Sequence, residues 1–451
     1  MLSKTLALAI AIVLFVELLR DKRPRYLVSL CAGCWMLVLL LLTHPPAVLE
    51  ALSLHSFLTP RFWFAHGGVT ELNVGINWST MFFLTGMMVL VEGMGEAGFF
   101  DWVSLRLARA LGFRPMAILL SFMILAALLA MFVDSVTVIL FLVAATVRLA
   151  QYLRFDPVPL IIGEIFAANL GGAATITGDP PNIMIGSNAG LTFFDFIAND
   201  APAVVIILVV VIVVFKFVYG RKLDSSEEDR KKVMALEPKD HIRDLALFKK
   251  SLAMIALVVV GFMLHGQLGL DSSVIALSAA CIMLLIGKAD LELSVFSVEW
   301  TTIGFFCGLF MVVGALSETG VITMLAQWLM SITNDNPLAL MLVILWASAI
   351  ISSILDNIPF VATMIPIITA IGATGVDVSS LWWALSLGAC LGGNGTLIGA
   401  SANVVLSSIS TKEGYPITFM DFTKEGMPIM LLTVAVATVY CIVRYAPALF
   451  A

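Results

Sequence analysis

Apolar runs long enough to form membrane-spanning helices follow one another along most of this chain. The stretches 202–219, 251–264 and 427–443 are nearly free of charged residues. A helix needs about 20 mainly apolar residues to cross a bilayer, whereas the strands of an outer-membrane barrel alternate apolar and polar positions. These runs do not alternate, so the pattern predicts an all-α polytopic membrane protein.

Composition supports this prediction. Of the 451 residues, 60% are hydrophobic and 12% are charged. A soluble domain has about 25% charged residues, so this chain has too little polar surface to cover its apolar side chains in water. No basic stripe lies beside exposed aromatic residues, so we expect no nucleic-acid partner. We expect a multi-pass protein of the inner (plasma) membrane, surrounded by the lipid bilayer.

The breaks between the apolar runs recur in the same order in the two halves of the chain. Each half contains full crossings, a pair of short arms that we interpret as a re-entrant hairpin, and a segment interrupted by Gly or Pro. The predicted boundaries are 1–220 for the first repeat (hairpin 116–150, broken helix 158–190), 221–250 for a charged linker, and 251–451 for the second repeat (hairpin 337–372, broken helix 380–411). The pattern therefore predicts about ten crossings plus two hairpins.

Individual residues repeat at a constant spacing. Trp78, Glu96 and Asp134 match Trp300, Glu318 and Asp356, all offset by 222 (300 − 78, 318 − 96, 356 − 134). In the interrupted segments, Gly171, Gly172, Thr175 and Asn182 match Gly392, Gly393, Thr396 and Asn403, all offset by 221 (392 − 171, 403 − 182). Such a stable offset indicates an internal duplication, which is common in secondary transporters.

The distribution of basic residues predicts how the repeats are oriented. The linker 221–250 contains nine Lys and Arg residues, which places it in the cytoplasm. If each hairpin enters and leaves on one face, each repeat has five crossings, and the second repeat is inverted relative to the first. Arg25 then lies on the cytoplasmic side, whereas the predicted outer segments, which include 191–201, carry a single basic residue, Arg61. Glu92 ends an apolar run near the inner face and is predicted to be interfacial.

Each hairpin has one acidic residue, which lies at its tip. Asp134 is followed by Ser135 and Thr137, and Asp356 is followed by Asn357. An Asp at bilayer depth costs about 2.5–3.5 kcal/mol on insertion scales and is usually retained for function. An Asp could also simply cap the returning helix, but capping does not require depth. We therefore predict that both tips bind the transported ion or substrate.

The interrupted segments supply further candidate residues. Three glycines and two prolines lie within Asn169–Asn182, and the matching segment is Leu391–Asn403. Broken helices expose carbonyls and helix ends that can coordinate ions, and matching breaks in two halves point to a transport site. Tight helix packing would explain the paired glycines but not the prolines. The candidate binding residues here are Thr175, Asp179, Asn182, Asn394, Thr396, Ser401 and Asn403, and Glu164 is a candidate proton-relay residue.

Three motifs make the chain similar to a known family. The segments Thr177–Ile183, Leu355–Pro366 and Leu391–Val405 resemble the ion transporter superfamily, and most closely the group of arsenite permeases, NhaD-type Na⁺/H⁺ antiporters and the pink-eyed dilution (P) protein. The resemblance covers about residues 70–445. It implies a fold like that of the divalent anion/sodium symporters, a homodimer, and an elevator movement of a transport domain against a scaffold.

The hairpin tips depart from one branch of this superfamily. The dicarboxylate branch has Ser-Asn-Thr at its tips, which suits carboxylate substrates, whereas this chain has Asp134 and Asp356 there. With Asp179 nearby and no Lys or Arg in these segments, we expect an acidic or neutral site. Such a site would repel a dianion and would admit a small cation, protons or a neutral hydroxide such as arsenite.

The leading hypothesis is secondary transport of a small inorganic ion, most simply Na⁺, in exchange for H⁺. Na⁺ would bind at Asp134, Asp356 and Asp179, because carboxylate oxygens suit hard cations. A proton competes for the same oxygens, so the site carries one species or the other in each direction. The coupling ion would then be H⁺, Na⁺ or both, and no cofactor is expected.

Other hypotheses stay open. Proton-coupled efflux of arsenite or antimonite is second, although Cys307 and Cys390 have no cysteine counterparts in the first repeat, which argues against capture by thiols. Na⁺-coupled symport of an anion or dicarboxylate is third. A channel is harder to exclude than an enzyme, because we find neither a nucleophile–base pair nor a metal cluster in the sequence and therefore do not expect an enzyme.

Overall fold

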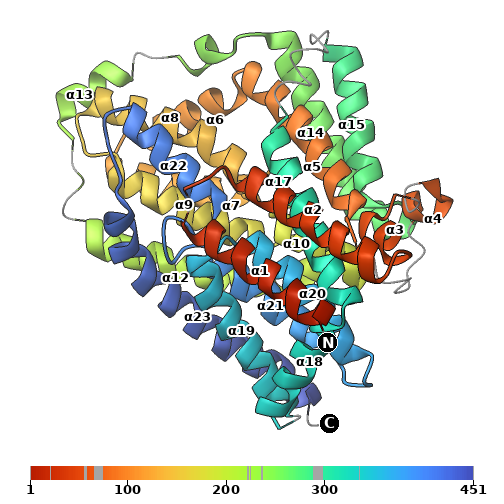
Figure 1. Cartoon of the computed structure of the whole chain (residues 1–451). Coiled ribbons are helices and arrows are strands. Elements are labelled where there is room, and N and C mark those ends of the chain that lie inside the picture. The colour runs from red at the N-terminus through yellow and green to blue at the C-terminus, as the bar shows by residue number, and fades with distance from the viewer. Residues whose placement is uncertain are drawn as a thin grey trace.

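The computed structural model describes residues 2–20, 22–54, 58–64, 75–220, 223, 225–234, 237–287, 298–334 and 336–449. Within these ranges the chain forms helices and no strand (Figure 1). The first half contains α1 (Leu2–Arg20), α2 (Arg25–Thr43), α3 (Ala47–Leu52), α4 (Pro60–Trp63), α5 (Trp78–Glu96), α6 (Phe99–Ala110), α7 (Pro115–Ala130), α8 (Ser135–Leu153), α9 (Val158–Ala173), α10 (Pro180–Ala189), α11 (Phe193–Asn199) and α12 (Ala201–Tyr219).

The second half repeats this order after a charged connection that contains α13 (Glu227–Val233) and a 3-10 turn (Pro238–His241). Its helices are α14 (Leu245–Leu268), α15 (Ser272–Gly287), α17 (Trp300–Glu318), α18 (Val321–Ile332), α19 (Pro337–Ile354), α20 (Asn357–Gly372), α21 (Ser379–Gly392), α22 (Ser401–Lys412) and α23 (Phe419–Leu449). Both ends of the chain lie away from α13 in Figure 1.

The helices confirm the predicted fold class of two inverted-topology repeats. The bounds of α5 and α6 recur in α17 and α18 at the predicted offset of 222 (300 − 78, 321 − 99). Gly98 precedes α6 with φ of +84°, and Gly320 precedes α18 with φ of +75°. Glycine populates this left-handed region without steric cost, so each repeat makes the same sharp turn into its short amphipathic helix.

Helix length alone does not separate crossings from hairpin arms. Among the described helices, seven are each long and apolar enough to cross a bilayer, and they include the arms α8 and α19. The tips make the distinction, because each arm pair turns at an Asp beside a broken helix: Asp134 begins α8, and Asp356 begins α20. The broken helices are α9–α10 and α21–α22, as predicted.

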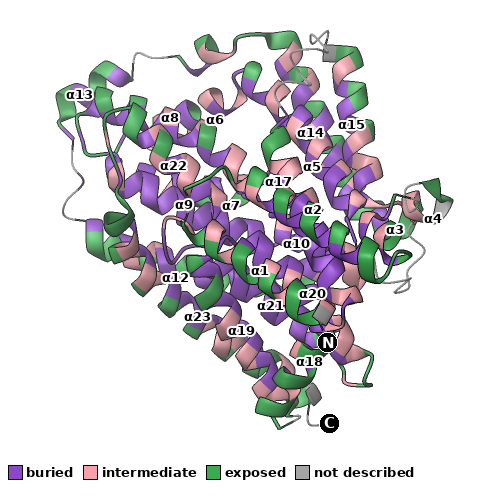
Figure 2. Ribbon diagram, viewed as in Figure 1, coloured by how far each residue is buried: buried purple, intermediate pink, exposed green. Residues whose placement is uncertain are grey.

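The first halves of the broken helices, α9 and α21, form a buried centre (Figure 2). In α9 every residue from Pro159 to Ala173 is buried, and so is every residue of α21 from Ser380 to Gly392. The hairpin arm α7 packs on α9, and α19 packs on α21. A Cβ at Gly171 would lie 2.1 Å from the carbonyl oxygen of Ala127, and one at Gly392 would lie 2.5 Å from that of Ala349. Glycine therefore permits the same close helix contact in both repeats.

A second group of helices packs beside this centre. Here α2 lies against α17, and α5 lies against α15. A Cβ at Gly308 of α17 would lie 2.3 Å from the carbonyl carbon of Ser29 in α2. A Cβ at its counterpart, Gly86 of α5, would lie 2.6 Å from the carbonyl carbon of Ala276 in α15. These two contacts hold α2 against α17 and α15 against α5 at equivalent glycines of the two repeats.

The close contact at Gly308 gives a testable pair of substitutions. We expect Gly308→Ala to lower stability by about 1–3 kcal/mol, because the new methyl group meets backbone that cannot rotate away. Gly304, one turn earlier in α17, would place its Cβ 3.5 Å from the nearest atom, Leu30 Cδ1. Gly304→Ala should therefore be neutral or slightly stabilising. Thermal unfolding in detergent measures both, and equal effects would contradict the packing argument.

Candidate functional site

A cavity of about 430 Å³ lies where the two hairpins meet the two broken helices. Four helices begin at its wall, α8, α10, α20 and α22. Six of the predicted site residues line it: Asp134, Ser135, Thr137, Asp179, Asn357 and Ser401. The structure therefore brings together residues from both repeats that are up to 267 positions apart in the chain (401 − 134).

Asp134 both lines the cavity and caps the returning arm of its hairpin. Its carboxylate accepts hydrogen bonds from the Thr137 backbone N–H at 3.0 Å and from the Thr137 hydroxyl at 2.7 Å. A carboxylate is favourable at a helix N-terminus. The same carboxylate therefore caps α8 and, because Asp134 remains partly exposed to the cavity, is also available to bind an ion there.

Asp179 connects the broken helix of the first repeat to the hairpin of the second. It precedes Pro180 at the start of α10, but its side chain does not cap that helix. Instead one carboxylate oxygen accepts a hydrogen bond from Asn357 Nδ2 at 3.0 Å and contacts Cys390 Sγ at 3.5 Å. Asp134 lines the same cavity as Asp179, and Asp356 directly precedes Asn357, so the three negative charges are neighbours that repel one another. A cation bound in the cavity would relieve this repulsion.

Asp356 is paired with a basic residue from outside the hairpins and broken helices, which the expectation of an acidic or neutral site did not include. Arg25, at the start of α2, places its guanidinium 3.1 Å from the carboxylate of Asp356 and also lines the cavity. The same carboxylate accepts a hydrogen bond from the Ser401 hydroxyl at 2.5 Å and one from the Ile358 N–H at 3.3 Å. The two hairpin tips therefore differ, because Asp356 already has a positive partner.

Two predicted threonines hold the breaks instead of facing the cavity. The Thr175 hydroxyl donates to the carbonyl of Met131, and the Thr396 hydroxyl donates to the carbonyl of Ser353 at 2.5 Å. Met131 and Ser353 end the first arms of the two hairpins, at the offset of 222 (353 − 131). Each threonine thereby ties the break of a broken helix to the hairpin of its own repeat.

The predicted asparagines perform a similar task at the breaks. The Asn182 amide donates to the carbonyls of Gly172, Ala173 and Thr175 at 3.0–3.2 Å. The Asn403 amide donates to the carbonyls of Gly393 and Thr396 at 2.7 and 2.9 Å. Each asparagine satisfies carbonyls that the interrupted helix leaves without partners, as a buried backbone requires.

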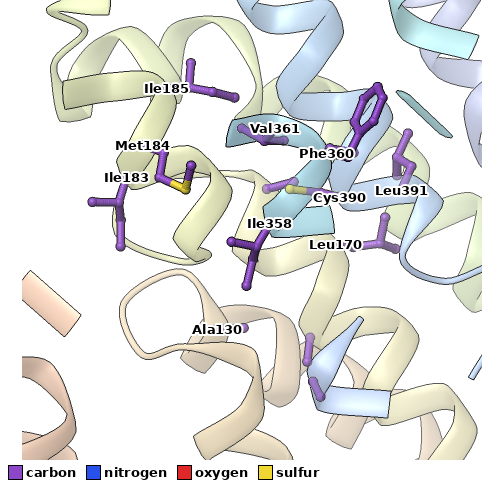
Figure 3. Close-up of a cluster of buried hydrophobic side chains, with 14 of the residues drawn as sticks. Ala130, Leu170, Ile183, Met184, Ile185, Ile358, Phe360, Val361, Cys390 and Leu391 are labelled. Atoms are coloured by element: carbon purple, nitrogen blue, oxygen red, sulfur yellow. The ribbon is translucent and has the colours of Figure 1, made fainter. Parts of the chain in front are cut away.

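The repeats differ at one position beside these asparagines. Asn169 donates to the side-chain oxygens of Asn403 at 3.1 Å and Asn394 at 2.8 Å. Its counterpart in the second repeat, at the offset of 221 (390 − 169), is Cys390, which contacts the side-chain oxygen of Asn182 at 3.9 Å. Figure 3 shows Cys390 among apolar side chains of the broken helices and the second hairpin, including Leu170, Ile183 and Ile358. Cys390 is buried, so a soluble reagent has no direct access to it.

Acidic and basic side chains surround the cavity further out. Glu92 of α5 lines its wall, so this residue is not merely interfacial, and Glu299 lines it as well. A neighbouring cavity of about 510 Å³ shares Arg25 and Ser401 with the first and is lined by Lys22 and Arg23. The first cavity is thus lined mainly by carboxylates, those of Glu92, Asp134, Asp179 and Glu299, whereas the charged groups of the second are Lys22, Arg23 and Arg25.

Glu164, the candidate proton-relay residue, lies away from the residues that line the cavity. It is fully buried in α9 and accepts a hydrogen bond from the Thr146 hydroxyl of α8 at 2.5 Å. Within the described part of the chain its second carboxylate oxygen has no hydrogen-bond partner. The geometry leaves its relay role a prediction.

Most of the chain matches one family of known proteins. The model of the citrate transporter family matches residues 12–388, most of the chain and nearly all of the cavity-lining helices. The chain belongs to the citrate transporter family. The predicted resemblance to the ion transporter superfamily is thereby confirmed, and this citrate transporter family member is a multi-pass membrane transporter.

Individual relatives support the same assignment. An uncharacterized transporter of Mycobacterium tuberculosis is 38% identical to this family member over 377 residues, 83% of this chain and 87% of that protein. The P protein of Homo sapiens is 30% identical over 497 residues, 92% of this chain and 59% of the P protein. The YdaH transporter of Alcanivorax borkumensis superposes with a TM-score of 0.53 at 14% identity, covering 81% of this chain and 84% of that one. That last likeness shows the fold.

The electrostatics of the cavity in this citrate transporter family member come from two sources. Four helix N-termini, those of α8, α10, α20 and α22, each contribute about half a positive charge. Asp134, Asp179 and Asp356 oppose them, and Arg25 pairs with the last of these. Asp134 and Asp179 therefore have no basic partner among the described residues.

Proposed function

We propose that this protein is a secondary active transporter that moves a small cation, most simply Na⁺, in exchange for H⁺. The observation that carries the proposal is the presence of Asp134 and Asp179 in one cavity, with neutral oxygens of Ser135, Thr137 and Ser401 around them. Carboxylate, hydroxyl and carbonyl oxygens are the ligands that hard cations prefer. Neither carboxylate forms an ion pair with a basic residue in the described part of the chain.

Exchange follows from competition for the same oxygens. A proton on Asp179 removes the negative charge that binds the cation. The cavity therefore binds the cation more weakly when Asp179 is protonated, and binds the proton more weakly when the cation is present. The Asn357 amide donates to Asp179 and stabilises its charged form. Each passage across the membrane would then return the site with the other species, and this gives obligatory coupling.

The arrangement of helices supports an elevator-type movement. The cavity is formed by hairpin and broken-helix elements, whereas Arg25, Glu92 and Glu299 belong to flanking helices or their ends. A movement of the central helices past the flanking helices would carry Asp134 and Asp179 away from these three charges. We place the protein in the inner (plasma) membrane.

A second candidate substrate is a carboxylate, such as the citrate in the family's description. The observation that favours it is the basic cavity lined by Lys22, Arg23 and Arg25, which adjoins the acidic one. A carboxylate accompanied by a cation would satisfy both cavities, because the cation would meet Asp134 and Asp179 while the carboxylate met the basic groups. The same helix N-termini also favour anions.

Transport in proteoliposomes with an imposed pH gradient tests these candidates. We expect Na⁺ or Li⁺ added outside to dissipate the gradient with saturable kinetics and counterflow. Empty liposomes are the control. Citrate uptake without any proton movement driven by Na⁺ would overturn the cation proposal in favour of the second candidate. Arsenite-driven proton movement would overturn both, and a flux that does not saturate would indicate a channel.

A further inference from the structure

A buried carboxyl group lies outside the cavity, in a segment that the sequence placed in an outer loop. Asp200 joins α11 to α12 and is fully buried. One of its carboxylate oxygens lies 2.5 Å from the Ser386 hydroxyl of α21. The other has no hydrogen-bond partner in the described part of the chain. A charged carboxylate with one bonded oxygen is costly inside a protein, whereas a protonated carboxyl needs fewer partners.

Ser386 connects this carboxyl to the break in the first broken helix. Its hydroxyl lies 2.7 Å from the side-chain oxygen of Asn182, whose amide holds the carbonyls of the break. The hydroxyl has one hydrogen, so it can donate either to Asp200 or to Asn182 at any moment. Asn182 is in turn within contact of Cys390, which reaches Asp179 at the cavity wall.

A purely structural role explains Asp200 poorly. It precedes α12, but its side chain accepts no hydrogen bond from the first backbone N–H groups of that helix, so it does not act as a cap. No basic residue in the described ranges pairs with it. A serine–asparagine contact alone would hold α10 to α21 without the cost of burying an acid.

We propose that Asp200 is a proton-binding residue of the transport cycle, and that Ser386 passes its protonation state to Asn182 at the break between α9 and α10. The inference rests on the proton coupling of the proposed function. With Asp200 charged, the Ser386 hydroxyl donates to Asp200. When Asp200 gains one proton, its O–H donates to Ser386, and Ser386 donates to Asn182. One proton is taken up, and no other covalent bond changes.

The groups that face this junction come from several helices. They are Cys390 of α21, Tyr440, Cys441, Arg444 and Tyr445 of α23, and His265 of α14 on the other side of α11. The hydroxyls of Tyr440 and Tyr445 donate to Asn199, and Arg444 donates to the carbonyl of Ala198. These three side chains therefore bond to the residues just before Asp200 and not to Asp200 itself. Ser386 therefore remains the contact through which Asp200 reaches the site.

Two variants and one control test the proposal. Asp200→Asn imitates the protonated carboxyl, because its amide can donate to Ser386. Ser386→Ala keeps Asp200 but removes the link to Asn182. Asp421→Asn is the matched control, since Asp421 also accepts a hydroxyl hydrogen bond, from Thr418 at 2.5 Å, but is exposed at the start of α23. Thermal unfolding in detergent first checks that each variant is folded.

Infrared spectroscopy of the purified full-length protein, titrated with pH, measures the proton directly. We expect a protonated-carboxyl signal that is lost in Asp200→Asn and kept in Ser386→Ala and Asp421→Asn. An unchanged signal in Asp200→Asn would overturn the proposal. This readout needs no substrate, so it tests Asp200 even if the wild-type protein fails to exchange Na⁺ for H⁺ and the proposed function is wrong.

Transport rates measured against pH test the link to the break, using whichever substrate the wild-type protein moves. We expect Asp200→Asn at high pH to transport at the rate that the wild-type protein shows at low pH. The change of transport rate with pH that comes from protonation of Asp200 should then be absent from this variant. Ser386→Ala should lose the same part while keeping the infrared signal, and Asp421→Asn should follow the wild-type profile. A wild-type profile in Ser386→Ala would overturn the transmission through Asn182.

Discussion

Replacement of Asp179 by Asn is expected to reduce cation-coupled proton transport by a factor of about 10 to 100. The variant keeps the shape of the side chain and a contact with Asn357, but it removes a charged ligand from the cavity wall. Interactions that involve a charged group are worth on the order of 1.5–3 kcal/mol. It also removes a group that takes up a proton, so both halves of the exchange are lost together.

Proton flux in proteoliposomes driven by Na⁺ measures this effect. Asp134→Asn is the informative comparison, because Asp134 also caps α8 by accepting two hydrogen bonds from Thr137. We expect the Asp134 variant to lose both affinity and some stability, whereas the Asp179 variant, which caps no helix, should lose transport with little change in thermal unfolding. Normal transport in Asp179→Asn would remove Asp179 from the binding site.

Replacement of Arg25 by Met is expected to destabilise the protein by about 3 kcal/mol. The side chain of Asp356 is 5% exposed, and its Oδ2 forms an ion pair with Nη1 of Arg25 at 3.1 Å. Removing one partner of a buried ion pair costs about 3–5 kcal/mol, because the remaining charge loses its compensation. Ser401 and the Ile358 N–H still bind Asp356, and they keep the effect at the lower end of this range.

A double variant separates the pair from the rest of the site. Arg25→Met combined with Asp356→Asn should recover most of the lost stability, since no uncompensated charge remains. Thermal unfolding of the two single variants and the double variant in the same detergent gives the coupling. If the double variant is no more stable than Arg25→Met alone, the ion pair does not explain the role of Arg25 at the second hairpin tip.

The repeat architecture could be predicted from the sequence because it depends on local features. Two acids at hairpin tips, glycines and prolines inside apolar segments, and a constant offset of 222 all leave a direct signal. The structure places Asp134, Asp179 and Asn357 around one cavity, as these signals suggested. Thr175 and Asn182 carried the same signal, but they bind carbonyls of the breaks, because an interrupted helix must satisfy its own backbone first.

Two residues could not be found by the same reasoning. Arg25 lies 331 positions before Asp356, and in the sequence it stands among basic residues near the membrane surface, which indicate only the topology. Asp200 lies in a short segment between apolar runs that looks like an outer loop, yet it is buried under α21 and α23. Both depend on packing between distant helices, which hydrophobic periodicity does not contain.

The packing of each hairpin against the opposite repeat has a consequence for how the protein is made. The arm α8 of the first repeat contacts α22, and the half-helix α10 contacts α20, both of the second repeat. When the ribosome has finished the first half of the chain, Asp134 and the break before α10 have their hydrogen-bond partners within the first repeat, but α8 and α10 still lack α22 and α20. The binding cavity can close only after α22 has been synthesised, so a chain that stops before Ser401 would insert most of its helices and still lack a complete site.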